Sequence, residues 1–137
     1  MRLFFYTAEN SAKSARFLAR LRKFQDLKQI VQLPSGRGLG SPPGLDLRSG
    51  DLIIFYAANG RELEKLAALT NAFANFRIII VLDIYDPPLV RQAYLLGAIF
   101  VTNSENGQEE IAMIAAKVMH RLRKKTARRN RNRQSVG

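Results

Sequence analysis

The sequence has no cysteine and only one histidine among its 137 residues. Without cysteine, disulfide bonds, thiolate catalysis and zinc–cysteine sites are excluded. A single histidine excludes a multi-histidine metal site and argues against a histidine-based catalytic relay. No apolar run approaches the roughly 20 residues of a membrane-spanning helix, and residues 1–6 are too short for the core of a signal peptide. We therefore expect a cytoplasmic protein with no membrane span and no cofactor.

Acidic residues are scarce as well: 11 stand against 22 lysines and arginines, which gives a net charge of +11. Eight of the basic residues follow residue 120, where no acid occurs. Because 47% of the residues are hydrophobic, residues 1–122 can build one folded domain. Residues 123–137 are predicted to form a basic, disordered tail that favours polyanions, because like charges at this density repel one another. A solubilising segment and a linker to a further domain are the alternatives for this tail.

Apolar runs alternate with helical patterns along the chain, which predicts an α/β fold. The runs Leu52–Tyr56 and Ile78–Leu82 are continuously apolar and predict central strands covered on both faces. Strands are predicted over residues 3–6, 30–33, 51–57, 78–82 and 98–102, and helices over residues 11–24, 61–75, 87–96 and from 108 onward. This order indicates a three-layer, doubly wound sheet of five parallel strands with helices on both faces.

Residues 34–50, between the second and third predicted strands, are rich in glycine and proline. The second helix is therefore expected to be short or replaced by a loop. Within this loop Gly36–Ser41 offers backbone N–H groups and one arginine, as phosphate-binding loops do. Such a loop needs a helix directly behind it, and Pro42-Pro43-Gly44 follows instead. The pattern favours a flexible connection.

Three segments, in their order and spacing, resemble the receiver domain of two-component response regulators, a chemotaxis-type flavodoxin-like domain. They are Asp51–Phe55, Ile78–Leu82 and Ala93–Ala98, and the resemblance extends over roughly residues 2–122. It implies a strand order of 2-1-3-4-5, with ligands near the carboxyl ends of the strands. It also implies a surface for partners or dimers, formed by the helix over residues 87–96, the fifth strand and the last helix.

The phosphorylation chemistry of receivers does not carry over to this sequence. An aspartyl phosphate needs a carboxylate nucleophile, magnesium held by oxygen ligands, and a cation for the phosphoryl charge. The matching positions hold Thr7 and Ala8 for the magnesium-binding acids, Tyr56 (or Ala57 after a one-residue slip) for the phosphoacceptor, Asp83 for the hydroxyl residue, and Asn103-Ser104 for the lysine. We expect a degenerate receiver that is not phosphorylated and is not an enzyme.

Two acids, Glu9 and Asp83, are weak candidates for holding a hard cation beyond the carboxyl ends of the strands. Asn59 and Asp86 would lie close to them. The alternative is that these side chains serve as helix caps and turn residues, because Asp86 directly precedes a proline and Asn59 a glycine. We favour this alternative and predict no metal site.

Four basic residues of the first predicted helix recur every three or four positions and share one face, with no acid between residues 11 and 25. In a receiver-like sheet the first and last helices lie side by side, so this stripe would join the basic residues of the last helix and the tail. A solvated helix face is the alternative. The candidate polyanion-binding residues are Lys13, Arg16, Arg20, Lys23, Lys117, Arg121, Arg123, Lys124, Lys125, Arg128 and Arg129.

Two functions compete. The first is a pseudo-receiver of two-component-type signalling that binds a protein partner, or a second copy of itself, without control by phosphate. The second is a nucleic-acid-binding regulatory protein that uses the basic surface and the arginine-rich tail. The sequence shows no base-reading motif and no exposed aromatic residues interleaved with the basic ones, as a base-stacking platform requires. The first function is therefore favoured.

Overall fold

The structure is a computed structural model, which describes residues 2–33, 51–68 and 77–134, with side chains as far as Arg121. Five parallel strands form one sheet in the order β2-β1-β3-β4-β5. This is the predicted order. The strands are β1 (Leu3–Thr7), β2 (Val31–Gln32), β3 (Leu52–Ala57), β4 (Arg77–Leu82) and β5 (Phe100–Asn103). The Gly/Pro-rich segment over residues 34–50 lies outside the described residues.

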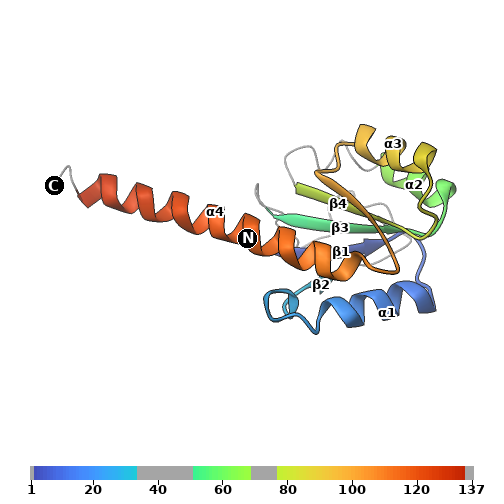
Figure 1. The fold of residues 1–137 in the computed structure, drawn as a ribbon, viewed down its shortest axis with the longest axis horizontal. Helices are drawn as coiled ribbons and strands as arrows, with labels where there is room; N and C mark the ends of the chain where they lie inside the picture. Colours follow the sequence, from blue (N-terminus) through green and yellow to red (C-terminus); the bar gives the residue numbers. More distant parts are fainter. Residues whose placement is uncertain (1, 34–50, 69–76, 135–137) are drawn as a thin grey trace.

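Helices cover both faces of the sheet, as Figure 1 shows. On one face lie α2 (Gly60–Ala67) and α3 (Pro87–Leu95), and on the other lie α1 (Ala12–Leu21), the short 3-10 helix η1 (Gln25–Leu27) and α4 (Gly107–Gln134). The prediction that the first and last helices lie on the same face is confirmed, since α1 and α4 contact one another.

The central strand β3 contributes to two separate hydrophobic cores. Its side chains alternate, so that Phe55 packs beneath α2 and α3 while Ile54 and Tyr56 pack beneath α1 and α4. Every residue of β3 is buried. This explains why its sequence is continuously apolar and not alternating, as expected for a parallel strand covered on both sides.

Side-chain caps begin three of the helices. Ser11 accepts a hydrogen bond from the Ser14 backbone in a capping box, Asn59 accepts one from Glu62, and Asp86 accepts one from Leu89. Gly97 follows α3 with a φ of 97°, a conformation that glycine adopts without steric cost. These caps align the helices so that each crossover begins at the carboxyl end of a strand.

The boundaries differ from the prediction by two residues or more in three places. The first helix ends at Leu21 and not near Phe24, because Gln25–Leu27 turns into a 3-10 helix. The strand β5 begins at Phe100 and not at Ala98, since α3 ends in a turn at Gly97 and the register with β4 starts at Phe100. The predicted helix over residues 61–75 is described as far as Ala67 only, because residues 69–76 lie outside the described part.

The last helix is longer than expected. The backbone of α4 is helical over 28 residues to Gln134, and its C-terminal part extends beyond the sheet (Figure 1). This differs from the disordered tail predicted from residue 123. The reason is that residues 122–134 contain no glycine or proline and are rich in arginine and lysine, which favour helices even where their charges repel. The division into a domain over residues 1–122 and a tail over residues 123–137 stays a prediction.

Candidate functional site

The carboxyl ends of four strands meet at one edge of the sheet. Tyr56, near the end of β3, pairs in register with Thr7 of β1 and Val81 of β4, and Leu82 of β4 pairs with Asn103 of β5. The positions that carry phosphorylation chemistry in receivers are therefore gathered here, as the sequence predicted from the strand order. What they hold is different: Thr7 and Ala8 are buried, and neither supplies a carboxylate.

Tyr56 occupies the predicted phosphoacceptor position with an aromatic ring. The ring lies 6.4 Å from that of Phe5 on β1 and 5.6 Å from that of Phe17 on α1, measured between centroids. Only 2% of Tyr56 is exposed. The side chain at this position therefore belongs to the core between the sheet and α1.

The hydroxyl group of Tyr56 is buried and makes no hydrogen bond within the described part of the chain. Burial, and to a lesser extent the nearby Asp83 carboxylate, raises the pKa of Tyr56 above its ordinary value of 10.0. The hydroxyl therefore stays protonated at neutral pH and can act as a hydrogen-bond donor.

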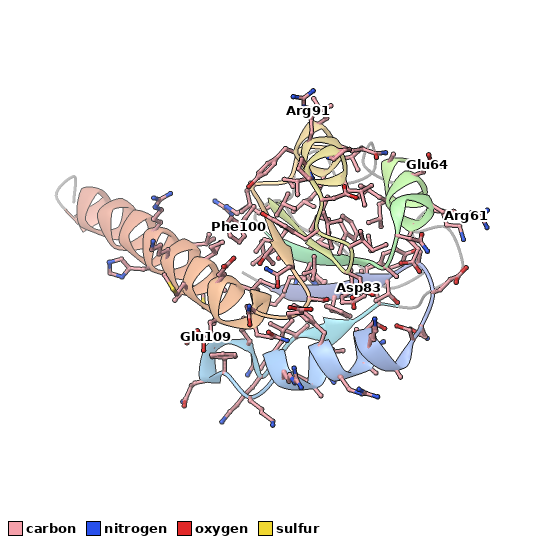
Figure 2. The ribbon with its side chains drawn as sticks, turned by 45° about the vertical axis from the view of Figure 1, so that its right-hand side comes forward. Arg61, Glu64, Asp83, Arg91, Phe100 and Glu109 are labelled. Carbon is pink, nitrogen blue, oxygen red and sulfur yellow. The ribbon has the colours of Figure 1, made fainter. Side chains whose placement is uncertain are left out.

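Asp83, just beyond β4 and labelled in Figure 2, is held by two neighbours. Its Oδ1 accepts a hydrogen bond of 2.8 Å from Ser104 Oγ, and its Oδ2 lies 3.4 Å from Nζ of Lys13 on α1. Asp83 therefore links the end of β4 to both β5 and α1.

A cavity of about 230 Å³ opens beside Tyr56, between α1 and the beginning of α4. Three cations of α1 reach it, and its wall includes a second buried donor without a partner, Nε2 of Gln108 on α4. The lining residues are Lys13, Arg16, Phe17, Arg20, Tyr56, Asp83, Ser104, Glu105 and Gln108.

The two weak metal candidates are not brought together with other ligands. Glu9 lies 3.3 Å from Nζ of Lys65, and Asp83 is paired with Lys13. Asn59 and Asp86 act as helix caps, as the favoured alternative predicted. Over residues 2–33, 51–68 and 77–134, no three histidine, cysteine or acidic side chains form a cluster that could hold a metal ion.

The basic residues do not all belong to one surface. Lys13, Arg16 and Arg20 line the cavity on the α1 side of α4, and Lys23 is exposed near the end of α1. Lys117 lies on the other side of α4, toward β5. Lys117 therefore lies apart from the cations of α1, and the single basic surface stays a prediction. Arg121 is exposed, and the side chains of Arg123, Lys124, Lys125, Arg128 and Arg129 lie outside the described part.

Two site residues were not found from the sequence. Gln108 was expected only as the start of the last helix, and Glu62 was not predicted to be a site residue. Glu62 is buried, and its carboxylate accepts a hydrogen bond from the backbone N–H of Ala58, just after β3. A glutamate three residues after an asparagine cap is the sequence signal for such a contact, whereas no sequence pattern marks Gln108 as a cavity residue.

A second concave surface lies along β5 on the far side of α4. This groove, of about 360 Å³, is lined by Ile99, Phe100, Glu110, Met113, Ile114 and Lys117. Met113 is 59% exposed and Ile99 is 47% exposed. Figure 2 shows Phe100 at the sheet edge between α3 and α4. We call these six residues the β5 groove. None of the helices in the described part of the chain combines the length and apolar character needed to cross a bilayer.

Solved structures with the same fold are receiver domains and related chains. The phosphorylated cyanobacterial phytochrome response regulator RcpA matches with a TM-score of 0.57 and 11% identity, over 86% of this chain and 91% of that one. A Burkholderia pseudomallei response regulator, solved with a phosphorylated aspartic acid, calcium and citrate, matches with a TM-score of 0.55 and 14% identity, over 88% of this chain and 72% of that one. The Caulobacter crescentus pilus assembly protein CpaE matches with a TM-score of 0.53 and 14% identity, over 86% of this chain and 99% of that one.

The sequence comparisons gave no match, since no protein-family model and no curated protein matches this sequence. The identities of 11–14% to the solved structures establish architecture and not chemistry. The strand order, the parallel pairing and the helices on both faces agree with the expected resemblance. The chain therefore has the fold of the response-regulator receiver domain.

Proposed function

We propose that this protein is a pseudo-receiver: a cytoplasmic, non-catalytic regulatory module that is not phosphorylated and that pairs with a second copy of itself through the β5 groove. The observation that carries the proposal is the replacement of the phosphoacceptor position by the buried ring of Tyr56, while an apolar surface stays exposed along β5.

The absence of phosphotransfer rests on three features of the strand ends. The last two residues of β3, Tyr56 and Ala57, are both buried, and neither carries a carboxylate. Asp83 is already held by Ser104 and Lys13. The position expected for a lysine holds Asn103, whose Oδ1 accepts hydrogen bonds from the backbone of Glu105 and Asn106. The nucleophile and the cation needed for an aspartyl phosphate are thus both replaced.

We expect no phosphorylation by a small phosphodonor. The full chain is incubated with acetyl phosphate and magnesium, and its intact mass is measured, with a phosphorylatable receiver domain as the positive control. The mass should stay unchanged under conditions that fully modify the control. A gain of one acid-stable or acid-labile phosphoryl group would contradict the proposal.

The β5 groove has the composition of an interface centre. Its middle is apolar, with Met113 and Ile114 on α4 facing Ile99 and Phe100 of the sheet edge. Tyr94 and Leu95 are exposed on the neighbouring helix α3, and Leu95 is 80% exposed. Apolar side chains gathered on one face of a small domain mark a surface for another protein.

The charges around this centre favour a second copy as the occupant. Glu110 lies three residues before Met113, and Lys117 lies three residues after Ile114, on the same helix. If two α4 helices pack antiparallel about a two-fold axis between Met113 and Ile114, each Glu110 meets the Lys117 of the other copy. Such a self-complementary arrangement is what a two-fold symmetric interface requires.

Charge exchange at this surface tests the dimer. Lys117→Glu should raise the dimer dissociation constant by about tenfold or more, because it brings two like-charged pairs together. The double variant Glu110→Lys/Lys117→Glu should restore much of the affinity, although it loses the 2.8 Å hydrogen bond from Thr102 Oγ1 to Glu110. Analytical ultracentrifugation over a concentration series measures both constants.

Arg61→Glu is the control for this experiment, because Arg61 is exposed on α2, on the opposite side of the sheet, as Figure 2 shows. This variant should dimerise like the parent chain. If the parent chain is monomeric at all concentrations, or if the double variant dimerises no better than the single one, self-association through the β5 groove is wrong.

A further inference from the structure

Two buried hydrogen-bond donors in one cavity have no partner. Oη of Tyr56 and Nε2 of Gln108 are buried and unpaired within the described part of the chain, and both residues line the cavity between α1 and the start of α4. Tyr56 is 2% exposed and Gln108 is 8% exposed. Because buried polar groups in folded proteins are nearly always hydrogen-bonded, two such donors at one cavity are available to a further acceptor.

The charges around the cavity favour an anionic acceptor. Arg16 and Arg20 line it and form no ion pair with any residue that the structure describes. Lys13 and Asp83 offset one another at 3.4 Å. Glu105, which also lines the cavity, is exposed to solvent. Counting these five groups leaves one net positive charge on the cavity wall, while Glu109 and Glu110 in the first turn of α4 offset the positive end of that helix.

We propose that this cavity binds a small tetrahedral oxyanion of the phosphate class, held without covalent attachment by Tyr56, Gln108, Arg16 and Arg20. Phosphate offers several acceptor oxygens, and guanidinium groups match their geometry. The volume of about 230 Å³ lies below the roughly 300–1,000 Å³ of pockets that enclose drug-sized ligands. The cavity therefore has room for inorganic phosphate or for the head of a small phosphate ester.

This binding differs from receiver phosphorylation in its chemistry. The anion is held by hydrogen bonds and charge alone, with Tyr56 of β3 and Gln108 of α4 as donors. The cations come from α1, so an anion in the cavity would connect α1 with the start of α4. The site is independent of the β5 groove, which lies on the other side of α4.

The test is a titration of the ¹⁵N-labelled full chain with inorganic phosphate, at neutral pH and a constant ionic strength of about 0.15 M, which screens surface charge. The amide signals of Tyr56, Ser104 and Gln108 should shift and saturate with one dissociation constant. The double variant Arg16→Gln/Arg20→Gln should weaken binding by about tenfold or more, because charged hydrogen bonds are lost. Tyr56→Phe, which removes only the hydroxyl, should weaken it by about fivefold to tenfold.

Lys23→Gln is the matched control. Lys23 follows the cavity cations closely in the sequence but does not line the cavity. It should change the dissociation constant by less than about twofold. Glycerol phosphate and ATP test which phosphate compounds the cavity accepts. Glycerol phosphate should bind with the same affinity as inorganic phosphate, and ATP should bind no more tightly than inorganic phosphate. If potassium chloride shifts the same signals equally, or if the shifts are confined to residues 123–133, the cavity does not bind phosphate and the proposal is wrong.

Discussion

Replacing Tyr56 with alanine is expected to lower the free energy of unfolding by about 3–5 kcal/mol, the usual cost of removing a buried aromatic ring. The ring contacts those of Phe5 and Phe17 and lies in the core between the sheet and α1. Alanine would leave a cavity next to both phenylalanines. Chemical denaturation followed by circular dichroism measures the change.

Tyr56→Phe is the matched variant, and the expected result has the opposite sign. It keeps the ring and removes a buried hydroxyl that has no partner in the described part of the chain. In chloride buffer we expect an increase of about 1 kcal/mol, because an unsatisfied buried group is destabilising. Adding phosphate should reduce this advantage, since a ligand that binds only the folded parent chain stabilises it. A Tyr56→Phe chain that is less stable than the parent in chloride would show that the hydroxyl has a partner.

Replacing Phe55 with alanine is expected to cost a similar amount, about 3–5 kcal/mol, through the other core. Phe55 is fully buried beneath α2 and α3, and its ring meets that of Tyr6 edge-on, at 5.8 Å and 86°. Against a typical domain stability of about 5–15 kcal/mol, this loss removes a large part of the total. The same denaturation experiment measures it.

Leu95→Ala provides the comparison for Phe55→Ala, because Leu95 is also a large apolar residue but is 80% exposed. Its change should stay within about 0.5 kcal/mol. Since Phe55 and Tyr56 are neighbours on one strand, large losses from both alanine variants would show that each face of the sheet carries its own core. A loss of less than about 1 kcal/mol from Phe55→Ala would contradict the three-layer packing.

Much of the fold could be predicted because its signals are local. Continuous apolar runs at β3 and β4, the cap at Asp86 and the glycine at position 97 each act within a few residues. The end of α1 was misplaced because the apolar spacing continues through Phe24 while the backbone leaves the helix at Leu21. The sequence did not predict that α4 continues beyond residue 122, because charge repulsion was weighted above helix propensity.

The candidate site was predicted in position and only partly in content. The strand order placed Tyr56, Asp83 and Ser104 at one edge, and the basic spacing placed Arg16 and Arg20 on one helix face. The orphan donors could not be foreseen. Whether the hydroxyl of Tyr56 or the amide of Gln108 finds a partner depends on how three elements meet in space, and no local pattern encodes that.

The length of α4 has a consequence for the way the molecule moves in solution. At 1.5 Å per residue its 28 residues extend about 42 Å, of which about 20 Å follows Arg121. A compact body with such a rod on one side tumbles anisotropically, faster about the rod's axis than end over end. The rod also carries most of the net positive charge far from the centre of mass, since residues 122–134 hold seven basic residues and no acid. In an electric field, or near a negatively charged surface, the protein therefore takes up a preferred orientation, with the arginine-rich end leading.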